Sequence, residues 1–249
     1  NIPKISPLST RPVEYRQNVF QSVTEESLFR KKMYEHLESK LDTTHHILIV
    51  ADEKNRDIEK ELQLRFPWSI KLRPEKSGYI IPELVDSLLL DSVQNKIILE
   101  TQSFPLIASA ISQFNAQNTE NRNVQVYTTY RSNAYNNDNL SRKALGGIKL
   151  TYPSGFKPFY KTFDDDYVEN FIDKFGKYPT IEVLRGYDVS IDAILRTAFA
   201  KNLTKSIELG ETQYESNRFF YQENYNESFI NKGYYILQHS GYDIFEIKE

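Results

Sequence analysis

The chain has 249 residues, 39% hydrophobic and 13% aromatic, which is enough to bury the core of one large domain or of two lobes. Its 31 basic and 34 acidic side chains give a net charge of -3, which excludes the positive field that a nucleic-acid partner requires. The sequence contains no cysteine, which excludes disulfides, cysteine-ligated zinc and thiol catalysis, and its apolar runs fall far short of the ~20 residues that span a bilayer.

The first predicted elements are a helix and a buried strand. Residues 22–41 are predicted to be helical, because Ser22 or Thr24 can cap the first turn and apolar side chains then recur at helical spacing. The run HILIVAD at 46–52 is apolar without interruption, which is typical of a strand covered on both faces.

Helices and strands then alternate as far as residue 130. Strands separated by helices of ~10–15 residues predict an α/β fold with a doubly wound parallel sheet and right-handed crossovers. The predicted helices are 56–66, 79–92 and 104–117, and the predicted strands are 69–74, 95–101 and 124–130.

The last hundred residues follow a different pattern. Two helices are predicted at 164–179 and 182–202, after a strand that follows Gly146 and Gly147, which we interpret as a helix stop. Alternating aromatic segments from residue 217 to the end predict an antiparallel hairpin or meander, with turns near 224–227 and 240–241.

Six segments in this order resemble type I periplasmic binding proteins, the family of branched-chain amino-acid receptors. GYDVSIDAIL at 186–195 is the most distinctive part. The segments are IPKISPLST (2–10), NVFQSVTEE (18–26), HILIVAD (46–52), KIILETQS (96–103), VQVYTTY (124–130) and FGKYPTIEVLRGYDVSIDAIL (175–195).

The resemblance implies a two-lobed fold. Lobe two would be a complete Rossmann-like domain formed by 21–149 with 205–249, and lobe one would consist of 1–20 with 150–204. It also implies that the first part of lobe one is missing, because the family has further βα units before the strand that matches IPKIS.

The resemblance further implies a non-enzymatic protein of the periplasm or cell envelope, similar to an ABC-transporter substrate-binding protein, with a lipoprotein anchor as one alternative. A small polar ligand would lie in the cleft between the lobes, which would close by a hinge motion, with no cofactor. In lobe one, the loop after the first strand would supply Ser6, Ser9 and Thr10, whose hydroxyls can both donate and accept hydrogen bonds.

In lobe two, ligand residues are expected after three strands, because doubly wound sheets bind ligands at the carboxyl ends of their strands. The amino-acid receptors have an aromatic residue and an acid where this chain has EKNRD and YRSN, so the sequence favours an anion over an α-amino acid. The candidates are Asp52, Asn55, Thr101, Gln102, Ser103, Tyr130 and Arg131.

A second hypothesis is an interaction or structural module. Similar domains occur in peptidoglycan-associated lipoproteins with LysM repeats, and the altered ligand loops favour a chain that binds an envelope protein or peptidoglycan instead of a small molecule. The aromatic C-terminal segment, from Tyr214 to Tyr235, would be a candidate interaction surface.

An enzyme and a metal protein are the less favoured alternatives. Asp188 and Asp192 share one helix face, but no serine, histidine and acid follow a known nucleophile pattern, so no catalytic residue is assigned. His45 and His46 lack a carboxylate at metal-ligand spacing, and the acidic run 164–166 lacks the alternating ligands of an EF-hand, so no metal site is assigned.

Overall fold

A computed structural model describes residues 2–7, 17–158, 166–224 and 227–247. The chain divides into two compact units, each formed by two separate stretches of sequence. Unit one contains Asn1–Leu28 and Gly155–Tyr235, and unit two contains Phe29–Ser154 and Ile236–Glu249.

Unit two is built on a seven-stranded sheet in the order β13-β12-β7-β6-β5-β3-β4. Strands β4, β3, β5, β6 and β7 form a parallel run in which each strand is parallel to the next, whereas β13 is antiparallel to β12. The strands are β3 (His46–Ala51), β4 (Ile70–Leu72), β5 (Gln94–Glu100), β6 (Asn123–Tyr127), β7 (Thr151–Ser154), β12 (Tyr235–Ser240) and β13 (Asp243–Glu246).

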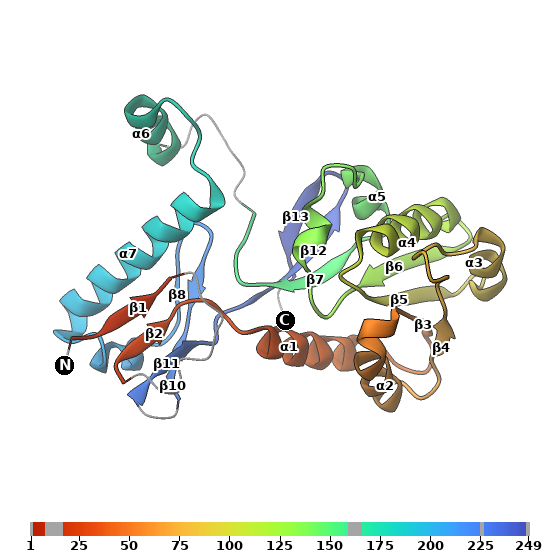
Figure 1. Cartoon of the computed structure of the whole chain (residues 1–249), viewed down its shortest axis with the longest axis horizontal. Helices are drawn as coiled ribbons and strands as arrows, with labels where there is room; N and C mark the ends of the chain where they lie inside the picture. The colour runs from red at the N-terminus through yellow and green to blue at the C-terminus, as the bar shows by residue number, and fades with distance from the viewer. Residues whose placement is uncertain (1, 8–16, 159–165, 225–226, 248–249) are drawn as a thin grey trace. The chain divides into compact units, whose positions relative to one another are not determined.

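Helices cover both faces of this sheet. Figure 1 shows α1 and α2 on one side of the strands and α4 and α5 on the other, which confirms the predicted doubly wound α/β fold. The helices are α1 (Glu26–Lys40), α2 (Arg56–Arg65), α3 (Pro82–Leu88), α4 (Phe104–Gln117) and α5 (Arg142–Gly147), with short 3-10 turns η1 (Glu53–Asn55) and η2 (Asn133–Asn136).

The core of unit two follows from the apolar runs of its central strands. Residues 95–100 of β5 and 47–51 of β3 are all buried, as predicted for strands covered on both faces. Met33 and Leu37 of α1 are completely buried at the helical spacing that the sequence predicts. Each such side chain contributes roughly 1.5–3 kcal/mol by leaving water.

The first helix starts later than its sequence predicts. Both expected cap residues are used elsewhere, because the Thr24 hydroxyl donates to the Gly233 carbonyl (2.6 Å) and the Ser22 hydroxyl donates to the Ser6 carbonyl (3.1 Å). Helix α1 therefore begins at Glu26. The side chains of Ser22 and Thr24 bind backbone carbonyls of other segments instead of capping the helix.

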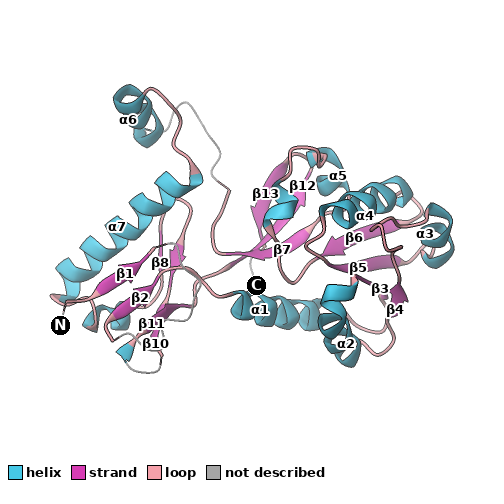
Figure 2. Ribbon diagram, viewed as in Figure 1, coloured by secondary structure: helices cyan, strands magenta, loops and turns pink. Residues whose placement is uncertain are grey.

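Unit one contains a four-stranded sheet in the order β1-β2-β11-β10 and a long helix, α7. Strands β1, β2 and β11 are parallel, and β10 is antiparallel to β11. Figure 2 labels most of its helices and strands. The elements are β1 (Lys4–Ser6), β2 (Val19–Gln21), α6 (Asp166–Phe175), α7 (Ile181–Ala200), η3 (Lys205–Leu209), β8 (Thr212–Gln213), β9 (Arg218–Phe219), β10 (Tyr221–Glu223) and β11 (Phe229–Asn231).

An aromatic core joins this sheet to α7. The rings of Phe20 and Phe229 stack with their centroids 4.3 Å apart, and Tyr221 meets Phe20 edge-on at 5.3 Å. Val189 of α7 belongs to the same buried cluster. These rings come from three neighbouring strands, so burying them fixes the order of the sheet as well as its distance from the helix.

The C-terminal segment divides between the two units, which corrects the expected domain boundaries. Residues 205–235 were expected in lobe two, but they belong to unit one, where the β10–β11 hairpin extends the small sheet. Only the β12–β13 hairpin joins the large sheet. Alternation of apolar and polar residues identifies a strand, but it carries no information about which sheet the strand enters.

Candidate functional site

Polar side chains gather where the parallel strands of unit two end. After β3 the chain turns to β4 on one side, then returns past β3 to form β5 on its other side, so the order of the sheet reverses between β3 and β5. Open parallel sheets bind ligands at the carboxyl edge beside such a reversal. We call this edge, with the loops that follow β3, β5 and β6, the switch edge.

Asp52 and Thr101 join the first two loops of the switch edge. One carboxylate oxygen of Asp52 accepts the Thr101 hydroxyl at 2.5 Å, and the other accepts the backbone amides of Lys54 and Asn55 at 3.1 and 3.2 Å. The Thr101 hydroxyl also accepts the Ser103 amide at 2.9 Å. Asp52 therefore caps η1 and fixes the β5 loop at the same time.

An ion pair joins the β5 and β6 loops to helix α1. The Arg30 guanidinium donates to the Glu100 carboxylate at 2.9 Å and to the Thr129 hydroxyl at 2.6 Å. The other oxygen of Glu100 accepts the Thr129 amide at 2.6 Å. Burial raises the pKa of the Glu100 carboxyl, and the positive charge of Arg30 opposes that rise.

Tyr130 and Arg131 complete the switch edge beyond β6. The Arg30 guanidinium lies 5.4 Å from the centre of the Tyr130 ring. Arg131 donates to the Asn136 side chain at 2.7 Å and lies 4.9 Å from the Tyr152 ring. Both residues are only partly buried, so they adjoin the solvent that a ligand would replace.

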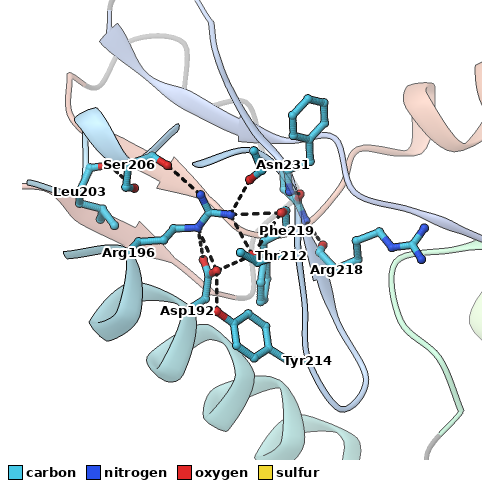
Figure 3. Close-up of polar contacts among 11 residues, drawn as sticks. Asp192, Arg196, Leu203, Ser206, Thr212, Tyr214, Arg218, Phe219 and Asn231 are labelled. Atoms are coloured by element: carbon cyan, nitrogen blue, oxygen red, sulfur yellow. Dashed lines mark hydrogen bonds and ion pairs between the residues drawn. The ribbon is translucent and has the colours of Figure 1, made fainter. Parts of the chain in front are cut away.

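The two aspartates of α7 have structural roles. Asp188 is completely buried, and one of its oxygens accepts the backbone and side-chain groups of Ser216 and Asn217. Asp192 accepts the Arg196 guanidinium at 2.9 Å with both oxygens, as Figure 3 shows. These contacts tie both carboxylates to groups of the segment that follows α7 or to Arg196 of the helix itself.

Arg196 is the centre of this buried network. Its side chain is 1% exposed and donates to the carbonyls of Ser206 (3.0 Å) and Gly210 (2.9 Å) and to the Thr212 hydroxyl (2.8 Å). Figure 3 shows the hydroxyl groups of Thr212 and Tyr214 directed at Asp192 from outside α7. The network fixes the segment after α7 to the helix.

Among the residues that the structure describes, no three histidine, cysteine or acidic side chains are grouped as metal ligands would be. No helix in the described ranges is long and apolar enough to cross a membrane.

Comparison with known proteins shows similarity in structure alone. No protein-family model and no curated protein sequence matches the chain. A branched-chain amino-acid ABC transporter periplasmic ligand-binding protein from Burkholderia xenovorans has a TM-score of 0.54 and 9% identity, over 92% of this chain and 70% of that one. A leucine-, isoleucine-, valine-, threonine- and alanine-binding protein from Brucella ovis has a TM-score of 0.50 and 9% identity, over 93% and 64%.

The chain has the fold of the type I periplasmic binding proteins. At this level of identity the likeness establishes the two-lobed α/β architecture that the sequence segments predict. That the chain lacks the first part of lobe one stays a prediction.

Of the ligand residues predicted for lobe one, only Ser6 falls in the described part of the chain. Ser6 is the last residue of β1 and is partly buried, whereas Ser9 and Thr10 lie outside the described residues. Arg185 of α7 approaches the same end of the sheet, where it donates to the Pro7 carbonyl at 2.7 Å and to the Ser22 hydroxyl at 3.3 Å.

The structure brings most of the predicted lobe-two residues to one edge. Asp52, Asn55, Thr101 and Ser103 are linked by direct hydrogen bonds, and Gln102 is exposed beside them. Sequence reasoning missed Arg30, which is separated from its partner Glu100 by 70 positions. An arginine on a helix with polar neighbours gives no signal that it faces a sheet edge.

Proposed function

We propose that the chain is a non-enzymatic ligand-binding protein of the bacterial cell envelope, and that it takes a small polar ligand at the switch edge. The fold supports this proposal, since both solved proteins described above are binding proteins and one of them is periplasmic. Fold alone does not determine function, so the proposal also requires a suitable set of side chains.

The hydrogen bond from Thr101 to Asp52 is the observation that carries this proposal. It joins the loops after β3 and β5 at the reversal of strand order, and so holds the neighbouring Gln102 and Ser103 in fixed positions before any ligand arrives. Preorganised polar groups of this kind bind a ligand without the cost of ordering loops. Tyr130 and Arg131 would add an aromatic ring and a positive charge.

The charges of the switch edge favour a ligand with an anionic group. The carboxylates of Asp52 and Glu100 already accept several hydrogen bonds within the protein, and Glu100 is neutralised by Arg30. An incoming ammonium group would therefore compete with these donors, whereas a carboxylate would meet the guanidinium of Arg131.

The proposal is tested by isothermal titration calorimetry of the chain with a panel of amino acids, small mono- and dicarboxylates, and muropeptides. We expect at least one carboxylate-bearing compound to bind. Arg131→Met should weaken that binding at least tenfold, about 1.4 kcal/mol, because it removes the cation and keeps the length of the side chain. Thr101→Val should also weaken it, since the loops lose their link.

Lys60→Met is the matched control. Lys60 is an exposed cation on α2 whose side chain is 70% accessible, so its loss changes the net charge by the same amount without touching the switch edge. Binding that Lys60→Met reduces as much as Arg131→Met would contradict the proposed site, and a panel in which nothing binds would contradict the proposed function.

A further inference from the structure

A row of polar side chains crosses one face of the large sheet, away from the switch edge. The Lys96 ammonium on β5 donates to the Gln125 side-chain carbonyl on β6 at 2.9 Å. The Gln125 and Gln238 amides, on β6 and β12, both donate to the Thr151 hydroxyl on β7, at 3.4 and 2.9 Å. We call Lys96, Gln125, Thr151 and Gln238 the polar row.

The register of the strands places the row on a single face. Lys96 is directly opposite Gln125, and opposite residues in neighbouring strands point to the same side of a sheet. Gln238 is in turn opposite Phe245 of β13, a residue that is 56% exposed. Gln125 and Gln238 are half-buried, so this end of the face is open to solvent.

Lys96 is a buried cation with a neutral acceptor. Lys96 is 6% exposed. No acidic side chain in the described ranges forms an ion pair with its ammonium group. Burial lowers the pKa of the Lys96 ammonium, and the positive charge of Lys149 lowers it further. A buried charge without a counter-ion is costly, and proteins normally place an acid beside it.

Lys149 is held next to the row by its backbone. Its φ of 49° lies in the left-handed region, which is unfavourable for a residue with a side chain, and its carbonyl accepts the Thr151 hydroxyl at 3.0 Å. Its side chain is exposed. The backbone of Lys149 is thereby tied to Thr151, a member of the polar row.

We propose that the polar row binds an oxyanion, a carboxylate or phosphate group, through Lys96 and Lys149. The anion would supply a counter-charge that Lys96 lacks among the described residues, and it would reduce the repulsion between the two ammonium groups. The second amide hydrogens of Gln125 and Gln238 provide further donors on the same face. Phe245 would lie beside any apolar part of the ligand.

This oxyanion site is separate from the switch edge. Lys96 precedes Glu100 by four positions on β5, which corresponds to about 13 Å along a strand. A ligand at the switch edge is therefore lost in Arg131→Met, whereas a ligand at the polar row is lost in Lys96→Met.

The test uses inorganic phosphate and acetate as probes, in calorimetric titrations of the full chain at constant ionic strength. We expect phosphate or acetate to bind the unmodified chain, and the stronger of the two identifies the class of oxyanion. Lys96→Met and Lys149→Met should each weaken that binding at least tenfold. Lys96→Met should not prevent folding, since replacing an unpaired buried charge with an apolar side chain of similar length is stabilising or neutral.

Lys143→Met is the matched control, because Lys143 is an exposed lysine on α5 outside the row. Equal losses in Lys143→Met and Lys96→Met would identify a non-specific effect of net charge and overturn the proposal. So would unchanged binding in Lys96→Met and Lys149→Met, or no binding of either probe up to ~10 mM, ten times a Kd of ~1 mM. Loss of binding in Arg131→Met alone would instead place the anion at the switch edge.

Discussion

Three groups of buried charges in the described part of the chain are compensated in different ways. Asp192 and Arg196 satisfy each other and several backbone carbonyls. The charge of Glu100, on strand β5, is neutralised by Arg30 of helix α1, and this ion pair fixes the switch edge to α1. Among the described residues, the acceptor of Lys96 is a neutral amide carbonyl, that of Gln125. The first arrangement stabilises the fold, whereas in the third no acidic side chain among the described residues offsets the charge.

Arg196→Met should lower the free energy of unfolding of unit one by about 3–5 kcal/mol, because it leaves Asp192 as a buried, unpaired carboxylate. Urea unfolding followed by circular dichroism measures the change. Arg65→Met is the control, since the partly exposed Arg65 pairs with Glu38 and Glu61 at the surface and such pairs contribute about 0–1 kcal/mol. Similar losses in both variants would contradict the structural role of the network.

His239 should make unit two less stable in mild acid. Burial, together with the charges of Arg131 and Arg142, lowers the pKa of its imidazole from 6.5 to about 4. Between these values the unfolded chain binds a proton that the folded chain does not, so stability is present above pH 6.5 and is lost as the pH falls toward 4.

His239→Phe should remove this dependence, because phenylalanine keeps a ring against Tyr152 and has no proton to gain. The unmodified chain should lose about 2 kcal/mol more than the variant between pH 7 and pH 5, measured by urea unfolding at each pH. Equal losses in the two proteins would show that other groups cause the acid sensitivity.

At the scale of elements, one close approach of backbones determines how α5 meets the β12–β13 turn. A Cβ atom added to Gly146 would lie 1.9 Å from the Gly241 carbonyl oxygen and 2.6 Å from its nitrogen. These are backbone atoms, which cannot rotate away as a side chain can. The glycine pair was predicted to stop a helix, and α5 does end at Gly147, but contact with the turn is a second reason for glycine.

Gly146→Ala should therefore destabilise unit two by about 1–3 kcal/mol, as overpacking does. Gly186→Ala is the matched control, since Gly186 lies inside α7 with no atom within 4 Å of an added Cβ, and alanine should stabilise that helix by about 0.5–1 kcal/mol. Thermal unfolding of the two variants measures both effects. The same sign of change in both would contradict this account.

The sequence predicts the elements well because their signals are local. The run HILIVAD becomes β3, and the predicted helix 182–202 becomes α7, because apolar periodicity depends on neighbouring residues only. Which sheet a strand joins depends on residues far away, so the hairpin at 221–231 was placed in the wrong lobe.

The candidate site follows the same rule. Asp52, Thr101 and Arg131 were predicted because each follows a recognisable strand, and strands of a parallel sheet end at one edge. Arg30 and Arg185 reach such edges from helices, over 70 positions to Glu100 and 163 positions to Ser22. No pattern in one sequence connects residues at that separation.

At the scale of the whole molecule, the two units have separate buried cores. Phe20, Phe219 and Phe229 belong to unit one, whereas the strands β3 and β5 form the core of unit two. Calorimetric unfolding should therefore show two transitions. Arg196→Met should lower the temperature of one and Gly146→Ala that of the other. A single transition that both variants shift equally would contradict independent cores.

The division of each unit into two stretches has a practical consequence for protein engineering. Residues 155–235 leave unit two after β7 and return to it at β12, and these are adjacent strands of one sheet. A short turn joining Ser154 to Ile236 would connect neighbours directly, so the parallel-sheet body is suited to expression as an independent miniature carrying both proposed anion sites.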